Sequence, residues 1–265
     1  MATVAGTAQR QPLAADHRFF MGGAIVMALL VVAGFSVQWL MGRSTFRAPP
    51  IIHLHAVVFM GWVAYYVLQN ALVAVGSVRL HKRLGWIGAG WAAVMVVLGV
   101  TITALMVRRG AAPFFFEPAY FLFMNSLGVL TFGALTAAAI VLRRQTAWHR
   151  RLHFCGMAIL TAPAFGRLLP MPLMIPHAGL GVFAGFILLP IAGVIADWRR
   201  SGRVHPAWWW GIGTLCVAQM LMSVIAFSPV GRALYYGVTA GAPGAAIDPY
   251  AFPPPPAGPL ITGGG

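Results

Sequence analysis

The chain has 265 residues, of which 60% are hydrophobic and only 8% are charged. Soluble globular proteins carry about 25% charged residues, so this composition excludes an ordinary water-soluble domain and predicts a multi-pass membrane protein. The net charge of +14 would indicate nucleic-acid binding in a soluble domain. Here the Lys and Arg residues lie in short segments between apolar runs, where anionic lipid headgroups are the natural counter-charge, and we exclude nucleic acid as a partner.

Seven apolar runs are each close to the length that crosses the hydrocarbon core, which takes about 20 helical residues. They predict an all-α bundle of seven transmembrane helices over residues 18–227, preceded by a polar cytoplasmic segment, 1–17. The predicted spans are 19–41, 51–75, 84–107, 118–142, 152–169, 177–196 and 207–227. The fifth span contains Pro163, which is expected to interrupt its helix.

The basic residues set the expected orientation. Most of the 18 Lys and Arg residues flank the spans on the amino-terminal side of the membrane, for example in segments 79–83, 143–151 and 199–203. Cytoplasmic loops carry an excess of Lys and Arg. The sequence therefore predicts a multi-pass protein of the cytoplasmic (inner) membrane, with a cytoplasmic amino terminus and an extracytoplasmic carboxyl terminus.

The carboxyl-terminal segment, 228–265, is rich in Gly and Pro and contains four consecutive prolines at 253–256. Such a run favours polyproline II and has no core of its own, so we expect the tail to be disordered when alone. Contact with a partner subunit of a larger membrane complex is the expected way to order it.

One short motif occurs twice. Residues 81–88 and 149–156 share the pattern H-[KR]-R-L-x-x-x-G. Each copy follows a span that runs inward and opens a span that runs outward. The pattern indicates a repeated hairpin, made of spans two and three and then of spans four and five.

Histidines at both membrane boundaries are the candidate cofactor ligands. Ionisable groups in membrane spans usually face the bundle interior or water. The topology pairs His55 with His177 at the outer face and His81 with His153 at the inner face. Two bis-histidine haem b sites need such a layout, which is similar in architecture to cytochromes of the b561 kind without sharing their motifs. Arg167 is a candidate partner for a haem propionate.

The helix that carries His55 has one face with polar handles. Phe59, Trp62, Tyr66 and Gln69 continue that face at helical spacing, and we expect it to look into the bundle.

The first hypothesis is a haem protein that exchanges electrons with a quinone or a partner subunit.

Two alternatives remain open. The first is a membrane enzyme with an iron, copper or zinc ion held at the outer face by His53, His55, His177 and Glu117. Glu117 and Arg167 are equally expected to form an ion pair. The second is an accessory subunit, without a cofactor, of a respiratory or photosynthetic complex. His149 and the neighbouring arginines 150 and 151 have an interfacial interpretation, as anchors that reach lipid phosphates.

The run from Ile51 to Gly85 resembles a bacterial group of predicted multi-span membrane proteins of unknown function. Those proteins similarly place a His at a span start, a Gln near the span's end and an H-R-x-L-G element after it. The corresponding residues here are His55, Gln69 and the segment that begins at His81. The resemblance implies the multi-span fold and no activity.

Overall fold

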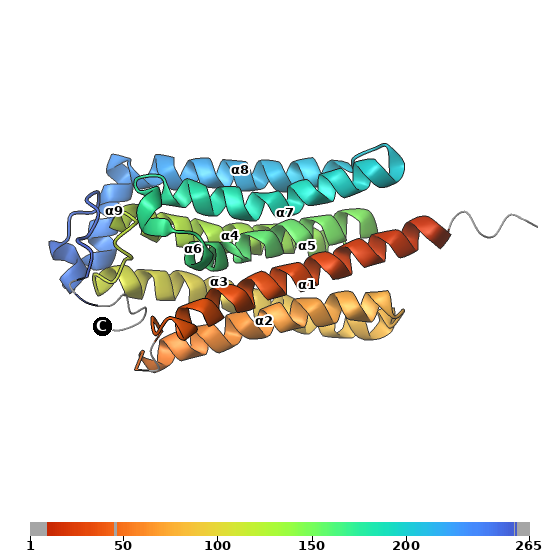
Figure 1. Ribbon diagram of the computed structural model, residues 1–265, viewed down its shortest axis with the longest axis horizontal. Helices are drawn as coiled ribbons and strands as arrows, with labels where there is room; N and C mark the ends of the chain where they lie inside the picture. The colour runs from red at the N-terminus through yellow and green to blue at the C-terminus, as the bar shows by residue number, and fades with distance from the viewer. Residues whose placement is uncertain (1–9, 45–46, 257, 259–265) are drawn as a thin grey trace, which may run out of the picture.

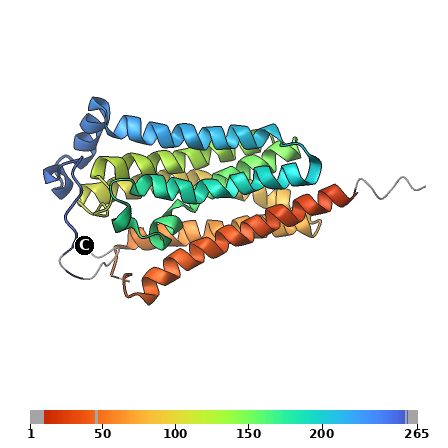
Figure 2. The ribbon, with the colours of Figure 1, turned by 45° about the horizontal axis from the view of Figure 1, so that its top comes forward.

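The structure is a computed structural model that describes residues 10–44, 47–256 and 258, and the regular elements of this part of the chain are helices (Figure 1). In chain order they are α1 (Arg10–Leu40), α2 (Pro50–Ala74), α3 (Val78–Arg108), α4 (Pro118–Val141), α5 (Thr146–Leu160), α6 (Ala162–Leu168), the 3-10 helix η1 (Met171–Met174), α7 (Ala178–Ser201), α8 (Pro206–Ala226), α9 (Pro229–Thr239) and the 3-10 helix η2 (Pro243–Ala246). The long helices form one elongated bundle, which α1 crosses obliquely (Figures 1 and 2).

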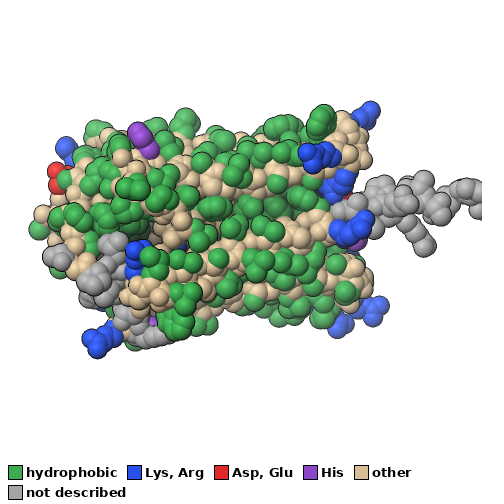
Figure 3. Space-filling view, in the orientation of Figure 1, with side chains coloured by type: hydrophobic (Ala, Val, Ile, Leu, Met, Phe, Trp, Pro, Cys, Tyr) green, Lys and Arg blue, Asp and Glu red, His purple; other side chains and the backbone are tan. Residues whose placement is uncertain are grey.

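Six helices, α1, α2, α3, α4, α7 and α8, are long and apolar enough to cross a membrane. They coincide with six of the seven predicted spans. Large apolar side chains are exposed on their outer faces, including Val57 at 70% and Val97 at 68%. Hydrophobic side chains cover the middle of the face seen in Figure 3, and Lys and Arg gather toward its ends. The fold is therefore an all-helical, multi-pass bundle whose apolar surface suits a bilayer.

The predicted fifth span, 152–169, is not one helix. α5 ends at Leu160, Thr161 caps it, and α6 starts at Ala162 with Pro163 as its second residue. A proline has no backbone N–H to donate to the preceding turn, which explains the break at this point. The Thr161 hydroxyl and the Thr161 amide both donate to the Ala158 carbonyl, at 2.6 Å and 3.0 Å.

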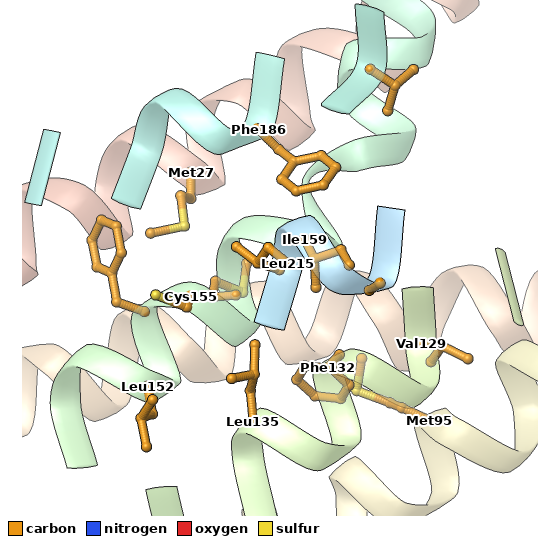
Figure 4. Close-up of a cluster of buried hydrophobic side chains, with 14 of the residues drawn as sticks. Met27, Met95, Val129, Phe132, Leu135, Leu152, Cys155, Ile159, Phe186 and Leu215 are labelled. Carbon is orange, nitrogen blue, oxygen red and sulfur yellow. The ribbon is translucent and has the colours of Figure 1, made fainter. Parts of the chain in front are cut away.

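Helix α4 lies at the centre of the bundle, against α3, α5 and α8, while α1 packs on α2 and α6. Side chains from six helices meet in a common core. The residues labelled in Figure 4 are Met27 of α1, Met95 of α3, Val129, Phe132 and Leu135 of α4, Leu152, Cys155 and Ile159 of α5, Phe186 of α7 and Leu215 of α8. This packing fixes α5 in the interior, where its first turns carry the polar residues described below.

The two copies of the repeated motif occupy equivalent places. His81 is the fourth residue of α3, and His149 is the fourth residue of α5. Gly88 and Gly156 each face the preceding long helix: a Cβ on Gly88 would lie 2.4 Å from the Tyr65 hydroxyl of α2, and one on Gly156 would lie 3.5 Å from a Leu135 side-chain atom of α4. Each motif thus begins a helix that returns closely along its predecessor.

Residues 229–250 of the tail are held by contacts with their own chain, and contact with a partner subunit stays a prediction. Tyr235 of α9 is fully buried and its hydroxyl donates to the Gly244 carbonyl at 3.2 Å. The Ala119 amide of α4 donates to the Pro249 carbonyl at 3.0 Å. These contacts seat residues 229–250 on the ends of α3, α4 and α8 that lie opposite the start of α1 (Figure 1). Of the predicted terminal segments, residues 1–9, 257 and 259–265 lie outside the described part.

Candidate functional site

Three histidines meet at the end of the bundle where α1 starts. His81 extends from the first turn of α3, and His149 and His153 lie one turn apart on α5. The ring centroids of His81 and His149 are 6.2 Å apart, and those of His149 and His153 are 4.9 Å apart. The predicted inner pair, His81 and His153, is therefore brought together with His149, which was expected to act as an interfacial anchor.

One hydrogen bond determines the tautomer of the His149 imidazole. Nδ1 of His149 lies 2.8 Å from the Ala139 carbonyl oxygen of α4. A carbonyl oxygen only accepts, so Nδ1 carries the proton and the lone pair of Nε2 stays available. Nδ1 of His81 is buried and has no hydrogen-bond partner. The cluster thus presents ring nitrogens that the protein itself does not satisfy.

A polar group on α2 lies close to this cluster. The Gln69 amide nitrogen donates to the Tyr65 hydroxyl at 2.6 Å, and that hydroxyl donates to the Leu84 carbonyl of α3 at 2.8 Å. The other end of the amide, Oε1 of Gln69, is buried without a partner, as is the hydroxyl of Thr136 on α4. Thr136 lies about one helical turn before Ala139, which accepts from His149.

The predicted inward face of α2 is confirmed. Trp62, Tyr66 and Gln69 are buried, whereas Leu68 on the opposite face is 45% exposed. The Trp62 ring packs edge-to-face on Phe132 of α4 at 5.4 Å between centroids. This ring contact is one of the side-chain contacts that join α2 to the central helix.

The predicted outer metal ligands are not gathered into one site. His53 and His55 lie in the first two turns of α2, Glu117 caps α4, and His177 is an exposed residue that caps α7. Within residues 10–44, 47–256 and 258, no group of three or more His, Cys, Asp or Glu side chains lies close enough to hold a metal ion. Partial burial raises the pKa of the Glu117 carboxyl above its usual value.

The expected ion pair between Glu117 and Arg167 is absent from the described residues. The Arg167 guanidinium instead lies over the Phe35 ring at 4.1 Å from its centroid. It donates to the Pro163 carbonyl at 2.9 Å. The side-chain amide of Gln38 donates to the Arg167 main-chain carbonyl at 3.0 Å, which ties α6 to α1.

A charge network at the α1 end was missed by the sequence analysis, which assigned Arg150 and Arg151 to lipid phosphates. Arg151 is only 5% exposed and donates to both carboxylate oxygens of Asp197 on α7. Arg200 donates to Asp197 at 2.8 Å and pairs with Asp16 at 2.7 Å, and Arg150 pairs with Asp16 as well. The network joins α1, α5 and α7.

Two further residues take part in that network. Trp208 is fully buried and its indole N–H donates to Asp197 at 2.9 Å. His205 caps α8: its Nδ1 accepts from the Ala207 amide at 3.1 Å. Partial burial, with the charge of Arg151 as the next cause, lowers the pKa of His205. Asp16 and Asp197 are two of the four acidic residues of the chain, and both lie at the end of the bundle that is richest in Lys and Arg. This placement was the signal in the sequence for an ion-pair network.

Comparison with models of protein families, with curated proteins and with solved structures finds no match to this chain.

Proposed function

We propose that the chain is a membrane redox protein that holds haem b at the cluster of His81, His149 and His153. The supporting observation is the meeting of three imidazoles from two helices, 6.2 Å and 4.9 Å apart between ring centroids. Haem iron takes two axial imidazoles, and the bound group supplies reversible one-electron transfer. His81 and His149, which belong to different helices, would hold the haem iron.

The donor chemistry of the cluster fits this role. Metal-ligating histidines typically donate their second ring N–H to a carbonyl or carboxylate, as His149 does to Ala139 at 2.8 Å. The unpartnered, buried Nδ1 of His81 is the second available ring nitrogen. Lys82 and Arg83, which follow His81 in α3 and are exposed, suit the propionates.

The alternative of a non-haem metal enzyme has less support. Such sites use at least three protein ligands, and the described residues hold no such group. A second haem at the outer face is also less supported, because no ring contact joins His55 with the exposed His177 among the described residues. The proposal accordingly rests on the inner cluster.

The topology belongs to the same proposal. We propose that α5 and α6 together make a seventh crossing, since residues 146–168 are long enough to span the hydrocarbon core. The end with the histidine cluster then faces the cytoplasm, because it carries most of the Lys and Arg residues. The repeated motif supports two copies of one hairpin, α2–α3 and α4–α5. Electrons would pass between the haem and a quinone or a partner subunit.

Absorption spectra of the detergent-purified protein, oxidised and dithionite-reduced, test the proposal. A Soret band and a reduced α-band are expected, both lost in His149→Ala and in His81→Ala. His17→Ala, a change at the same end outside the cluster, should leave the bands intact. Bands lost only in His177→Ala would place the haem at the outer face, and a colourless wild-type protein would sink the proposal.

A further inference from the structure

Three buried polar atoms without partners lie on one face of α2 at regular spacing. They are Nδ1 of His55, the indole N–H nitrogen of Trp62 and Oε1 of Gln69. The residues are seven apart, which is about two helical turns or about 10 Å along the axis. The row therefore covers about 20 Å of the hydrocarbon core, which is about 30 Å thick.

The row continues into the histidine cluster. Beyond Gln69, the next unpartnered buried atoms are Nδ1 of His81 and the hydroxyl oxygen of Thr136, at the inner ends of α3 and α4. Of the six buried side-chain atoms without partners in the described residues, only Nε of Arg150 falls outside this row. Four of these atoms thus belong to α2 and the first turn of α3, and the fifth, on Thr136 of α4, lies 3.6 Å from where a Cβ on Gly156 of α5 would be.

Unpaired groups of this kind need a partner that is not protein. Trp62 is 3% exposed and Gln69 is 9% exposed, so neither reaches water at the surface of the bundle. Buried polar groups are nearly always hydrogen-bonded, and hydrocarbon offers no donor or acceptor. Internal water is the usual partner when polar groups line a gap between helices. The main backbone contacts of α2 are with α1 and α3, so its inward face meets α4 through side chains.

We propose that the inward face of α2 lines a hydrated seam, with water bound at His55, Trp62 and Gln69, that connects the outer boundary of the membrane with the inner histidine cluster. Each group has a distinct part: the indole N–H donates to water, the Gln69 carbonyl accepts from it, and the imidazole of His55 does either. Ionisable and polar groups in membrane interiors mark paths for protons. The seam gives protons a route to the cluster, and the inference stands independently of the haem proposal.

Hydroxyl-radical footprinting by X-ray radiolysis, read by mass spectrometry on the full chain in nanodiscs, tests this. Radicals formed from bound water oxidise the side chain beside it, even when that side chain is buried. Trp208 is the matched control, since it is fully buried and its N–H donates to Asp197. Trp91 is a second control: it is more exposed than Trp62 and its N–H donates to the Val58 carbonyl at 3.2 Å.

The hydrated seam predicts that Trp62 is oxidised several-fold faster than Trp208 and at least as fast as Trp91. Oxidation rates that follow exposure, with Trp91 fastest and Trp62 as slow as Trp208, would overturn the proposal. A cofactor in place of the water would give the same order of rates and would overturn it equally. Brief mixing with heavy-oxygen water before irradiation tests the connection to bulk. Heavy oxygen should appear on Trp62. Its absence would show that the internal water does not exchange with bulk water, which would refute the proton route.

Discussion

Arg151 of α5 donates two hydrogen bonds to Asp197 of α7, from Nε at 2.9 Å and from Nη2 at 2.8 Å. The two groups form a parallel fork, the strongest geometry of an arginine–carboxylate pair. Both residues are buried, and the Trp208 indole and the Arg200 guanidinium donate to the same carboxylate. Asp197 is therefore the acceptor on which α5, α7 and α8 converge.

Replacing Asp197 with Asn should destabilise the bundle by about 3 kcal/mol, because Arg151 would remain buried without its counter-charge. The free energy of unfolding in mixed micelles measures the effect. Asp248→Asn is the matched control, since it makes the same chemical change at an exposed tail residue. Equal losses in the two variants would contradict a structural role for the buried pair.

Gly88→Ala and Gly90→Ala should change the free energy of unfolding in opposite directions. A Cβ on Gly88 would lie 2.4 Å from the Tyr65 hydroxyl, so alanine there forces α2 and α3 apart at a cost of about 2 kcal/mol. Gly90 has nothing within 4 Å, and alanine there should stabilise the helix by up to about 1 kcal/mol. Unfolding midpoints of the two variants in the same detergent decide it, and similar shifts would refute the close approach of the two helices.

Gly244→Ala should release the tail from the bundle. The added Cβ would lie 1.9 Å from the Val107 carbonyl oxygen, which is backbone and cannot move aside. Gly237→Ala, with nothing within 4 Å, is the control in the neighbouring helix α9. Limited proteolysis should cut the tail faster in the first variant only. Unchanged cleavage would mean that η2 is not seated against the end of α3.

Stability should fall on mild acidification through His205. Its pKa is lowered from 6.5 in the folded protein, so the unfolded chain binds the proton more readily. The contribution of neutral His205 to the free energy of unfolding is fully present above pH 6.5. It is lost as the pH falls from there toward the pKa of the folded state, because protonated Nδ1 can no longer accept from Ala207. His205→Asn keeps a capping acceptor that does not titrate. Midpoints between pH 7.5 and 5 should then depend less on pH in the variant than in the wild type.

The helices were predictable because hydropathy is a local property of the sequence, and the inward face of α2 followed from helical periodicity alone. The break after Thr161 followed from Pro163. The partner of Arg151 did not follow, because it lies 46 residues away and the pairing depends on how α5 and α7 pack. The burial of Trp208 did not follow for the same reason: a run of three tryptophans is typical of a membrane interface, and only the packing of α8 turns the first of them inward.

The histidine cluster was half predicted. Sequence spacing placed His149 and His153 on one face of a helix, and topology brought His81 to the same side of the membrane. The sequence could not show that the Ala139 carbonyl holds the His149 ring in place, because a backbone acceptor on a neighbouring helix leaves no trace in the sequence.

The seat of Gly244 has a consequence for how the protein is made. Chains are synthesised from the amino terminus, and early segments fold first. The Val107 carbonyl and the start of α4 are in place long before residues 229–250 emerge. The tail therefore docks onto helix ends that were made before it.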